Sequence, residues 1–167
     1  MLQAGRVLGV VSVVVSAAAI ARAAQAYTSP GLGYDDRQEE DRHALGAALK
    51  QNDRGAAARI ARRMAARHPE DPMAQYGAGM ANAQAGDCEA AIEPLRKLLE
   101  PPSPRLPPER LEFIERIRAH VHQTLGLCLD KLGRKDEARA EIAAFCELAE
   151  SAPDKDELKP SMERLCH

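Results

Sequence analysis

Apolar residues recur at steps of three and four through most of the chain after residue 41, which is the spacing of one face of an α-helix. Three stripes place small or apolar side chains five, nine and twelve positions after a turn at Asn52, Gly86 or Gly133. The residues are Ala57, Ala61 and Met64, then Ala91, Leu95 and Leu98, and then Ala138, Ile142 and Phe145. This alternation of turns and helical stripes predicts an all-α chain.

The turns also set a period along the chain. Asn52 and Gly86 lie 34 residues apart, whereas Gly86 and Gly133 lie 47 apart, which is 13 more. The excess coincides with Glu100–Pro108, which contains five prolines and cannot form a regular helix. A long helix is predicted directly after it, over Glu109–Leu132, and its early start is interpreted as a longer packing stripe. The alternative is a wall or lid that extends a groove.

Small residues lie where two helices of a hairpin would touch. Gly79 and Gly126 each stand seven residues before a turn glycine. Such residues let helices approach closely, which explains how a chain with 3% aromatic residues and no Trp packs a core. The turn glycines are expected to adopt the left-handed conformation, and Asp87 is expected to cap the helix that follows the second turn.

A helix-turn-helix unit of 34 residues with small packing positions resembles the tetratricopeptide repeat. The resemblance is best over Pro72–Leu99, nearly as good over His122–Ile142 and weakest in the first unit. It implies an all-α solenoid of helical hairpins, an α-α superhelix, with repeats at about 41–71, 72–100 and 109–150. The Pro-rich stretch is then an insertion, and residues 154–167 hold a capping helix that begins around Pro160.

The start of the chain has the features of an export signal. An apolar, uncharged run covers residues 7–21, and Ala24 and Ala26 form an A-x-A site, so residues 1–26 are interpreted as a signal peptide cleaved after Ala26. An uncleaved N-terminal anchor is the alternative. Residues 27–40 are polar and rich in glycine and acids, which predicts a flexible leader. We therefore expect an exported protein of the periplasm or cell envelope, bacterial by its short signal and its excess of arginine over lysine.

Cysteines and the remaining chemistry are interpreted with this location in mind. Four cysteines in an exported chain are expected to pair, as Cys88–Cys128 and Cys146–Cys166 by the antiparallel packing of successive hairpins, with other pairings and free thiols left open. No spacing fits a structural zinc site, and His120 and His122 point apart on a helix. No hydrolase, metalloprotease or phosphate-binding motif is present. We expect no cofactor, no metal and no enzymatic activity.

The resemblance implies that a partner binds on the concave face, which the first helix of each hairpin lines. The candidate residues mix apolar side chains with a polar rim, which suits an extended or helical peptide. They do not reproduce the lysine and asparagine array that clamps a C-terminal carboxylate. The main candidates are Arg42, Leu49, Lys50, Met73, Tyr76, Met80, Gln84, Gln123, Leu127 and Lys131, with Gly46, Ala83, His120 and Asp130 beside them.

Charge limits the kind of partner. Without Arg6 and Arg22, the 23 basic residues of the chain become 21 against 25 acidic ones, a formal charge of −4, which argues against general nucleic-acid binding. A basic strip of Arg59, Arg62, Arg63 and Arg67 is expected to be a solvated face, or else to touch anionic lipid or an acidic partner. The sequence thus favours a protein-binding adaptor or assembly factor of the envelope. A structural subunit of a larger envelope complex is the alternative, and the oligomeric state is left open.

Overall fold

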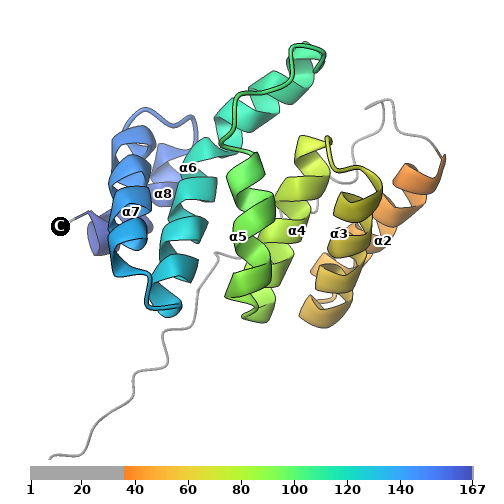
Figure 1. Ribbon diagram of the computed structural model, residues 1–167, viewed down its shortest axis with the longest axis horizontal. Helices are drawn as coiled ribbons and strands as arrows, with labels where there is room; N and C mark the ends of the chain where they lie inside the picture. The colour runs from red at the N-terminus through yellow and green to blue at the C-terminus, as the bar shows by residue number, and fades with distance from the viewer. Residues whose placement is uncertain (1–35, 167) are drawn as a thin grey trace, which may run out of the picture.

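The computed structural model describes residues 36–166, which form seven α-helices and no strand. Consecutive helices stand side by side in one row, and α8 lies behind α6 and α7 in the view of Figure 1. The predicted signal segment and most of the predicted leader lie outside the described residues. The helices are α2 (Asp36–Lys50), α3 (Arg54–Arg67), α4 (Pro72–Ala85), α5 (Cys88–Lys97), α6 (Pro108–Lys131), α7 (Lys135–Ala149) and α8 (Lys155–Leu165).

Three tight turns join the helices in pairs, α2 to α3, α4 to α5 and α6 to α7. Gly86 and Gly133 have φ angles of 85° and 78°, which confirms the left-handed conformation expected of both. In the first pair Asn52 takes the same place with a φ of 55°, since asparagine tolerates this region better than most residues. Each pair is therefore a helical hairpin, and the fold is the predicted row of hairpin repeats.

Aspartates start three of the helices. Asp53, Asp71 and Asp87 accept backbone N–H bonds from Ala56, Met73 and Ala90 at 2.9, 3.1 and 3.2 Å. These bonds satisfy N–H groups that have no partner within the helix. The predicted cap at Asp87 is thus confirmed, and α5 continues through Pro94 to Lys97 without a break.

Glycine allows the two helices of a hairpin to touch. A Cβ on Gly79 would lie 2.4 Å from the Leu95 side chain, and one on Gly126 would lie 2.6 Å from Cδ1 of Ile142. A carbon cannot occupy either place unless its neighbour moves. Helix α4 is accordingly surrounded on all sides, with every residue from 72 to 83 buried.

The core is divided between the junctions of successive hairpins. One cluster joins α2 and α3 to α4 through residues such as Leu45, Ala61 and Ala78. A second joins α4 and α5 to α6 through residues such as Leu95 and Leu125. A third, smaller cluster holds α8 against α6 and α7. Because each hairpin buries its surface against the next one, stability in this architecture comes mainly from neighbouring repeats.

Helix α6 is longer than its neighbours, and its N-terminal part rises above the row in Figure 1. Arg110 ties this part to Asp71 at the start of α4, with 3.1 Å between the guanidinium and the carboxylate. Phe113 lies against both of the larger core clusters and meets the ring of Tyr76 edge to face, with 5.7 Å between the ring centroids. The additional turns of α6 therefore act as a packing surface.

Two helix boundaries differ from the sequence predictions. Helix α2 begins at Asp36, so residues 36–40 of the predicted leader are helical, and Glu39 and Glu40 near its start suit the positive end of the helix dipole. Helix α8 begins at Lys155 instead of near Pro160. Leu158, which precedes the proline, is buried in the third cluster, and this packing stabilises an additional helical turn before Pro160. Within the described residues, no helix has the length and apolar character needed to cross a membrane.

Candidate partner-binding site

The apolar residues predicted to line the concave face are buried. Leu49 and Met73 belong to the first core cluster, whereas Tyr76 and Met80 belong to the second. Their exposed fractions lie between 4% and 9%. Met80 also accepts a hydrogen bond from the Thr124 hydroxyl on α6, at 3.5 Å from its sulfur. The structure therefore places these four residues in two core clusters, and their contact with a partner stays a prediction.

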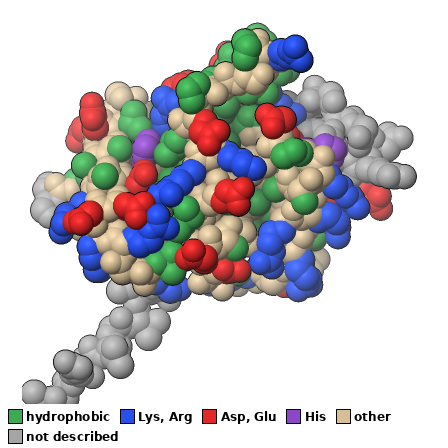
Figure 2. Space-filling model, in the orientation of Figure 1, with side chains coloured by type: hydrophobic (Ala, Val, Ile, Leu, Met, Phe, Trp, Pro, Cys, Tyr) green, Lys and Arg blue, Asp and Glu red, His purple; other side chains and the backbone are tan. Residues whose placement is uncertain are grey.

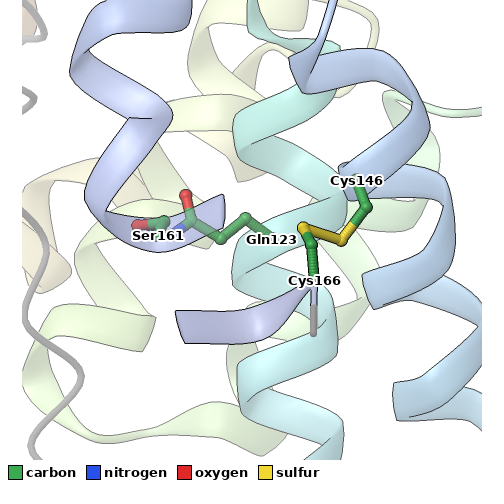
Figure 3. Close-up of a disulfide and its surroundings, with 4 residues drawn as sticks. All are labelled: Gln123, Cys146, Ser161 and Cys166. Atoms are coloured by element: carbon green, nitrogen blue, oxygen red, sulfur yellow. Dashed lines mark hydrogen bonds between the residues drawn. A yellow bond between two sulfur atoms is a disulfide. The ribbon is translucent and has the colours of Figure 1, made fainter. Parts of the chain in front are cut away.

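The polar candidates are mostly engaged in contacts within the chain. Arg42 is 1% exposed and donates to Glu39, with 3.0 Å from Nε to Oε2. Gln123 donates to the Ser161 hydroxyl on α8 at 2.6 Å, as Figure 3 shows. Lys131 reaches the carbonyl of Gly86 at 3.3 Å. The Arg42 bond lies within α2, whereas the bonds of Gln123 and Lys131 join α6 to other parts of the fold.

The other candidates differ in their surroundings. Lys50 is exposed and Gln84 is partly buried, at the ends of α2 and α4 near the turns. Gly46 and Ala83 are buried, and His120 and Asp130 bond to Asp154 and Lys135, each at 2.6 Å. Leu127 is partly buried and, like Asp130, borders the open groove described below. Its surroundings make it the best-placed of the predicted contact residues.

An open groove of about 800 Å³ lies between α6, α7 and the end of α8. Its apolar lining includes Leu127, Ala138, Ile142, Ala143 and Leu165. Its charged lining is Asp130, Lys135, Arg139 and Arg164, which is three cations to one anion in a chain whose net charge is −2. Sequence reasoning found Leu127 and Asp130 but missed the rest, because it considered only the first helix of each hairpin.

A disulfide closes one wall of the groove. Cys146 on α7 is bonded to Cys166 at the end of α8, with 5.7 Å between the Cα atoms, which confirms the pairing predicted for these two residues. Figure 3 shows this bond and the Gln123–Ser161 contact near each other. Because the C-terminal half of α8 is held at Ser161 and Cys166, its last residues form a fixed edge of the groove.

The start of α8 is anchored separately. The Asp154 carboxylate, just before the helix, bonds to Nε2 of His120 on α6 at 2.6 Å. Leu158 packs with Phe145 and Ala149 of α7 in the third cluster. Helix α8 therefore covers the middle of the α6–α7 pair and leaves the part nearer the turn at Gly133 uncovered.

The other predicted disulfide is absent. Cys88 and Cys128 are free cysteines, buried side by side at the junction of α5 and α6. The packing argument placed these two thiols together correctly, but the bond between them is not formed, which corrects the prediction. Burial raises the pKa of the Cys128 thiol far above its ordinary value, and a hydrogen bond with Cys88 raises it further.

The basic strip of α3 is largely a set of ion pairs. Arg63 and Arg67 bind the carboxylate of Asp41 on α2 at 2.6 and 2.7 Å, and Arg62 lies 3.3 Å from Asp87. Burial alone would raise the pKa of Asp41, but the hydrogen bonds and charges of the two arginines hold it below its usual value. Basic and acidic side chains are interleaved over the face shown in Figure 2. Arg63 and Arg67 therefore join α3 to α2, and Arg62 joins α3 to the start of α5.

The two histidines of α6 point to different helices. His120 binds Asp154, whereas Nδ1 of His122 lies 2.7 Å from Glu141 on α7. Within residues 36–166, no three or more His, Cys, Asp and Glu side chains are grouped as a metal site would require. Each histidine thus connects two helices.

Comparison with known proteins adds one match. The family model of the tetratricopeptide repeat matches residues 47–107, from the last turn of α2 to the end of the Pro-rich connection. Neither the curated proteins nor the solved structures contain a match to the chain.

Proposed function

We propose that the chain is a tetratricopeptide repeat protein that acts as an adaptor or assembly factor of the cell envelope, on the match of its residues 47–107 to that repeat and on its row of helical hairpins. Repeats of this family generally mediate binding between proteins. The observation that carries the proposal is the groove of about 800 Å³ at the end of the hairpin row, which has an apolar floor and a charged rim. Such a surface suits a segment of another protein better than it suits a small polar substrate.

The envelope location rests on two separate features. The apolar run at residues 7–21 with Ala24 and Ala26 favours export and cleavage after Ala26. The Cys146–Cys166 bond is the kind that persists in an oxidising compartment. Mass spectrometry of the protein from its native cells should therefore find a mature chain that begins at Tyr27 in the envelope fraction. Recovery of the intact N-terminus in the cytosolic fraction would contradict the location.

Crosslinking in intact cells tests the interaction itself. Leu127→Glu places a charge on the groove floor, and Leu132→Glu makes the same change at an exposed residue just after α6, outside the groove lining. We expect one discrete protein to crosslink to the wild type and to Leu132→Glu, and to be lost with Leu127→Glu. If no protein crosslinks to the wild type or to either variant, the adaptor proposal is contradicted. One large assembly recovered with all three would instead favour a structural subunit.

A further inference from the structure

The groove is equivalent to a hairpin surface that is buried elsewhere in this chain by the next helix. Gly86 and Gly133 are equivalent turn residues 47 positions apart. The residues 47 positions before the groove residues Leu127 and Ile142 are Met80 and Leu95, which therefore hold the equivalent places in the preceding hairpin. Met80 and Leu95 form part of the α4–α5 surface that α6 covers, in one cluster with α6 residues such as Val121 and Leu125.

The same relation holds at the preceding junction. In the first hairpin, 34 positions earlier, Ala61 corresponds to Leu95 and Ala57 to Ala91. These two alanines are covered by Ala74 and Ala78 of α4. Twice in this chain, then, the same face of a hairpin is buried by the first helix of the next unit. The groove is the third such face.

Helix α8 covers only part of this third face. It has 11 residues, against 14 in α4 and 24 in α6. Leu95 is 0% exposed and Met80 is 7% exposed, whereas Ile142 and Leu127 remain partly accessible along the groove. Space for the side chains of one more helix is therefore left beside the end of α8.

Charge separates the groove from the equivalent α4–α5 face. Cys88 and Ile92 on the α4–α5 face correspond to Lys135 and Arg139 in the groove. Lys135 binds Asp130 at 2.6 Å, and Arg139 binds Asp136, which is 92% exposed. The remaining cation of the rim, Arg164, makes no ion pair with any described residue. An occupant with carboxylates beside an apolar stripe would match this rim.

We propose that the groove binds an acidic amphipathic helix of a partner protein, which takes the place of the first helix of a further repeat. Its apolar stripe packs on Leu127, Ala138 and Ile142, and its carboxylates face Arg139 and Arg164. This inference rests on the proposed function and names the partner chemistry of the same site.

Two synthetic peptides test the inference on the disulfide-bonded mature protein. Both are about 20 residues long, so that a helix can form, and share one leucine stripe. One peptide carries glutamate and the other lysine at the flanking positions. Fluorescence anisotropy should show the acidic peptide binding about tenfold or more tightly than the basic one. Equal binding of both peptides, or no binding of the acidic one, would overturn the proposal.

Matched variants locate the binding. Ala143 and Ala140 are both exposed on α7, but only Ala143 lines the groove. Ala143→Glu should weaken the acidic peptide about tenfold or more, and Ala140→Glu should leave its affinity unchanged. Both variants should melt like the wild type, because the substitutions are at exposed helical positions. Equal affinity of Ala143→Glu and the wild type would overturn the inference.

Charge reversal and self-association complete the test. Arg139→Glu with Arg164→Glu should abolish the preference for the acidic peptide, whereas Arg59→Glu with Arg116→Glu, on α3 and the exposed side of α6, should keep it. Sedimentation of the wild type should show a monomer. A dimer that Ala143→Glu dissociates and Ala140→Glu does not would make a second copy the occupant and overturn the proposal. Peptide binding in vitro and crosslinking in cells are independent, so the two proposals can fail separately.

Discussion

The α4–α5 and α6–α7 hairpins follow the same plan but differ in what covers them. In the first, Leu95 and Met80 are sealed under α6. In the second, the equivalent Ile142 and Leu127 border an open groove, and α8 covers only a part of the face. In a row of hairpins, therefore, one pattern of residues becomes core or binding surface according to what the next segment of chain supplies.

The two hairpins should differ most in the free energy of unfolding that is lost when equivalent side chains are truncated. Leu95→Ala opens a cavity in a sealed cluster and should lower the free energy of unfolding by about 3–4 kcal/mol. Ile142→Ala removes a side chain that already borders the groove, so its cost should be about 1–2 kcal/mol. Chemical denaturation of both variants with the disulfide intact measures the two values. Equal losses would mean that the α6–α7 face is as well covered as the α4–α5 face.

Removing the disulfide should give the second-largest difference in stability between the two hairpins. The Cys146–Cys166 bond closes a loop with a sequence separation of 20, for which the chain-entropy relation gives about 3 kcal/mol. The double variant Cys146→Ser, Cys166→Ser should lose about that much, because the unfolded chain is no longer held in a closed loop. Hydrogen exchange should show the loss of protection concentrated in α8 and absent from α4 and α5. Loss of protection spread evenly over all helices would contradict the separation of the two hairpins.

Much of the fold could be predicted from sequence because its signals are local. Turn glycines, the aspartate at residue 87, the prolines of residues 100–108 and the spacing of small residues each act within a few positions of the chain. The antiparallel arrangement of neighbouring helices placed Cys88 beside Cys128, although these two thiols are free, and left Cys146 to pair with Cys166, as it does. These features depend on helix geometry and not on details of side-chain packing.

The site could not be predicted in the same way. Tyr76 was expected on a concave binding face, but the additional turns of α6 bring Phe113 against its ring and help to bury it. The groove combines residues of α6, α7 and α8, including Arg139 and Arg164, which no single helical stripe connects. Its existence depends on how far α8 extends over the α6–α7 face, and that follows from three-dimensional packing.

Adding one methyl group where the two helices of each hairpin touch should produce a smaller difference in stability between the hairpins. In Gly79→Ala the new Cβ meets Cγ and Cδ2 of Leu95, both at 2.4 Å, and this side chain has no space to move. In Gly126→Ala it meets Cδ1 and Cγ1 of Ile142 at 2.6 and 2.7 Å and its backbone nitrogen at 3.3 Å, but this side chain borders the groove and has space to turn into it.

We expect losses of about 2 kcal/mol for Gly79→Ala and below about 1 kcal/mol for Gly126→Ala, since overpacking is partly offset by the helix preference of alanine. Thermal unfolding followed by circular dichroism measures both variants. A greater loss at Gly126 would show that Ile142 is held as firmly as Leu95.

The smallest effect should come from an ion pair that links the two hairpins across their outer surface. The Glu137 carboxylate on α7 accepts hydrogen bonds from Arg134 at 2.7 and 2.8 Å and from Arg96 on α5 at 2.6 Å. Bonds from Arg134, and then from Arg96, lower the pKa of Glu137 from 4.5 to about 2. The carboxylate is solvated, so Glu137→Gln should lower the melting temperature at neutral pH only slightly.

The sign of the pH dependence makes this small effect testable. A carboxylate whose pKa is lower in the folded than in the unfolded chain stabilises the fold above the unfolded value, here about 4.5, and ceases to do so as the pH falls to about 2. The melting difference between wild type and Glu137→Gln should therefore be constant from neutral pH to about 5 and shrink below it. Glu147→Gln, an exposed change on the same helix, should show no such difference at any pH. A Glu137 difference that persists at pH 2 would mean that side-chain shape, and not charge, links the covered hairpin to the open one.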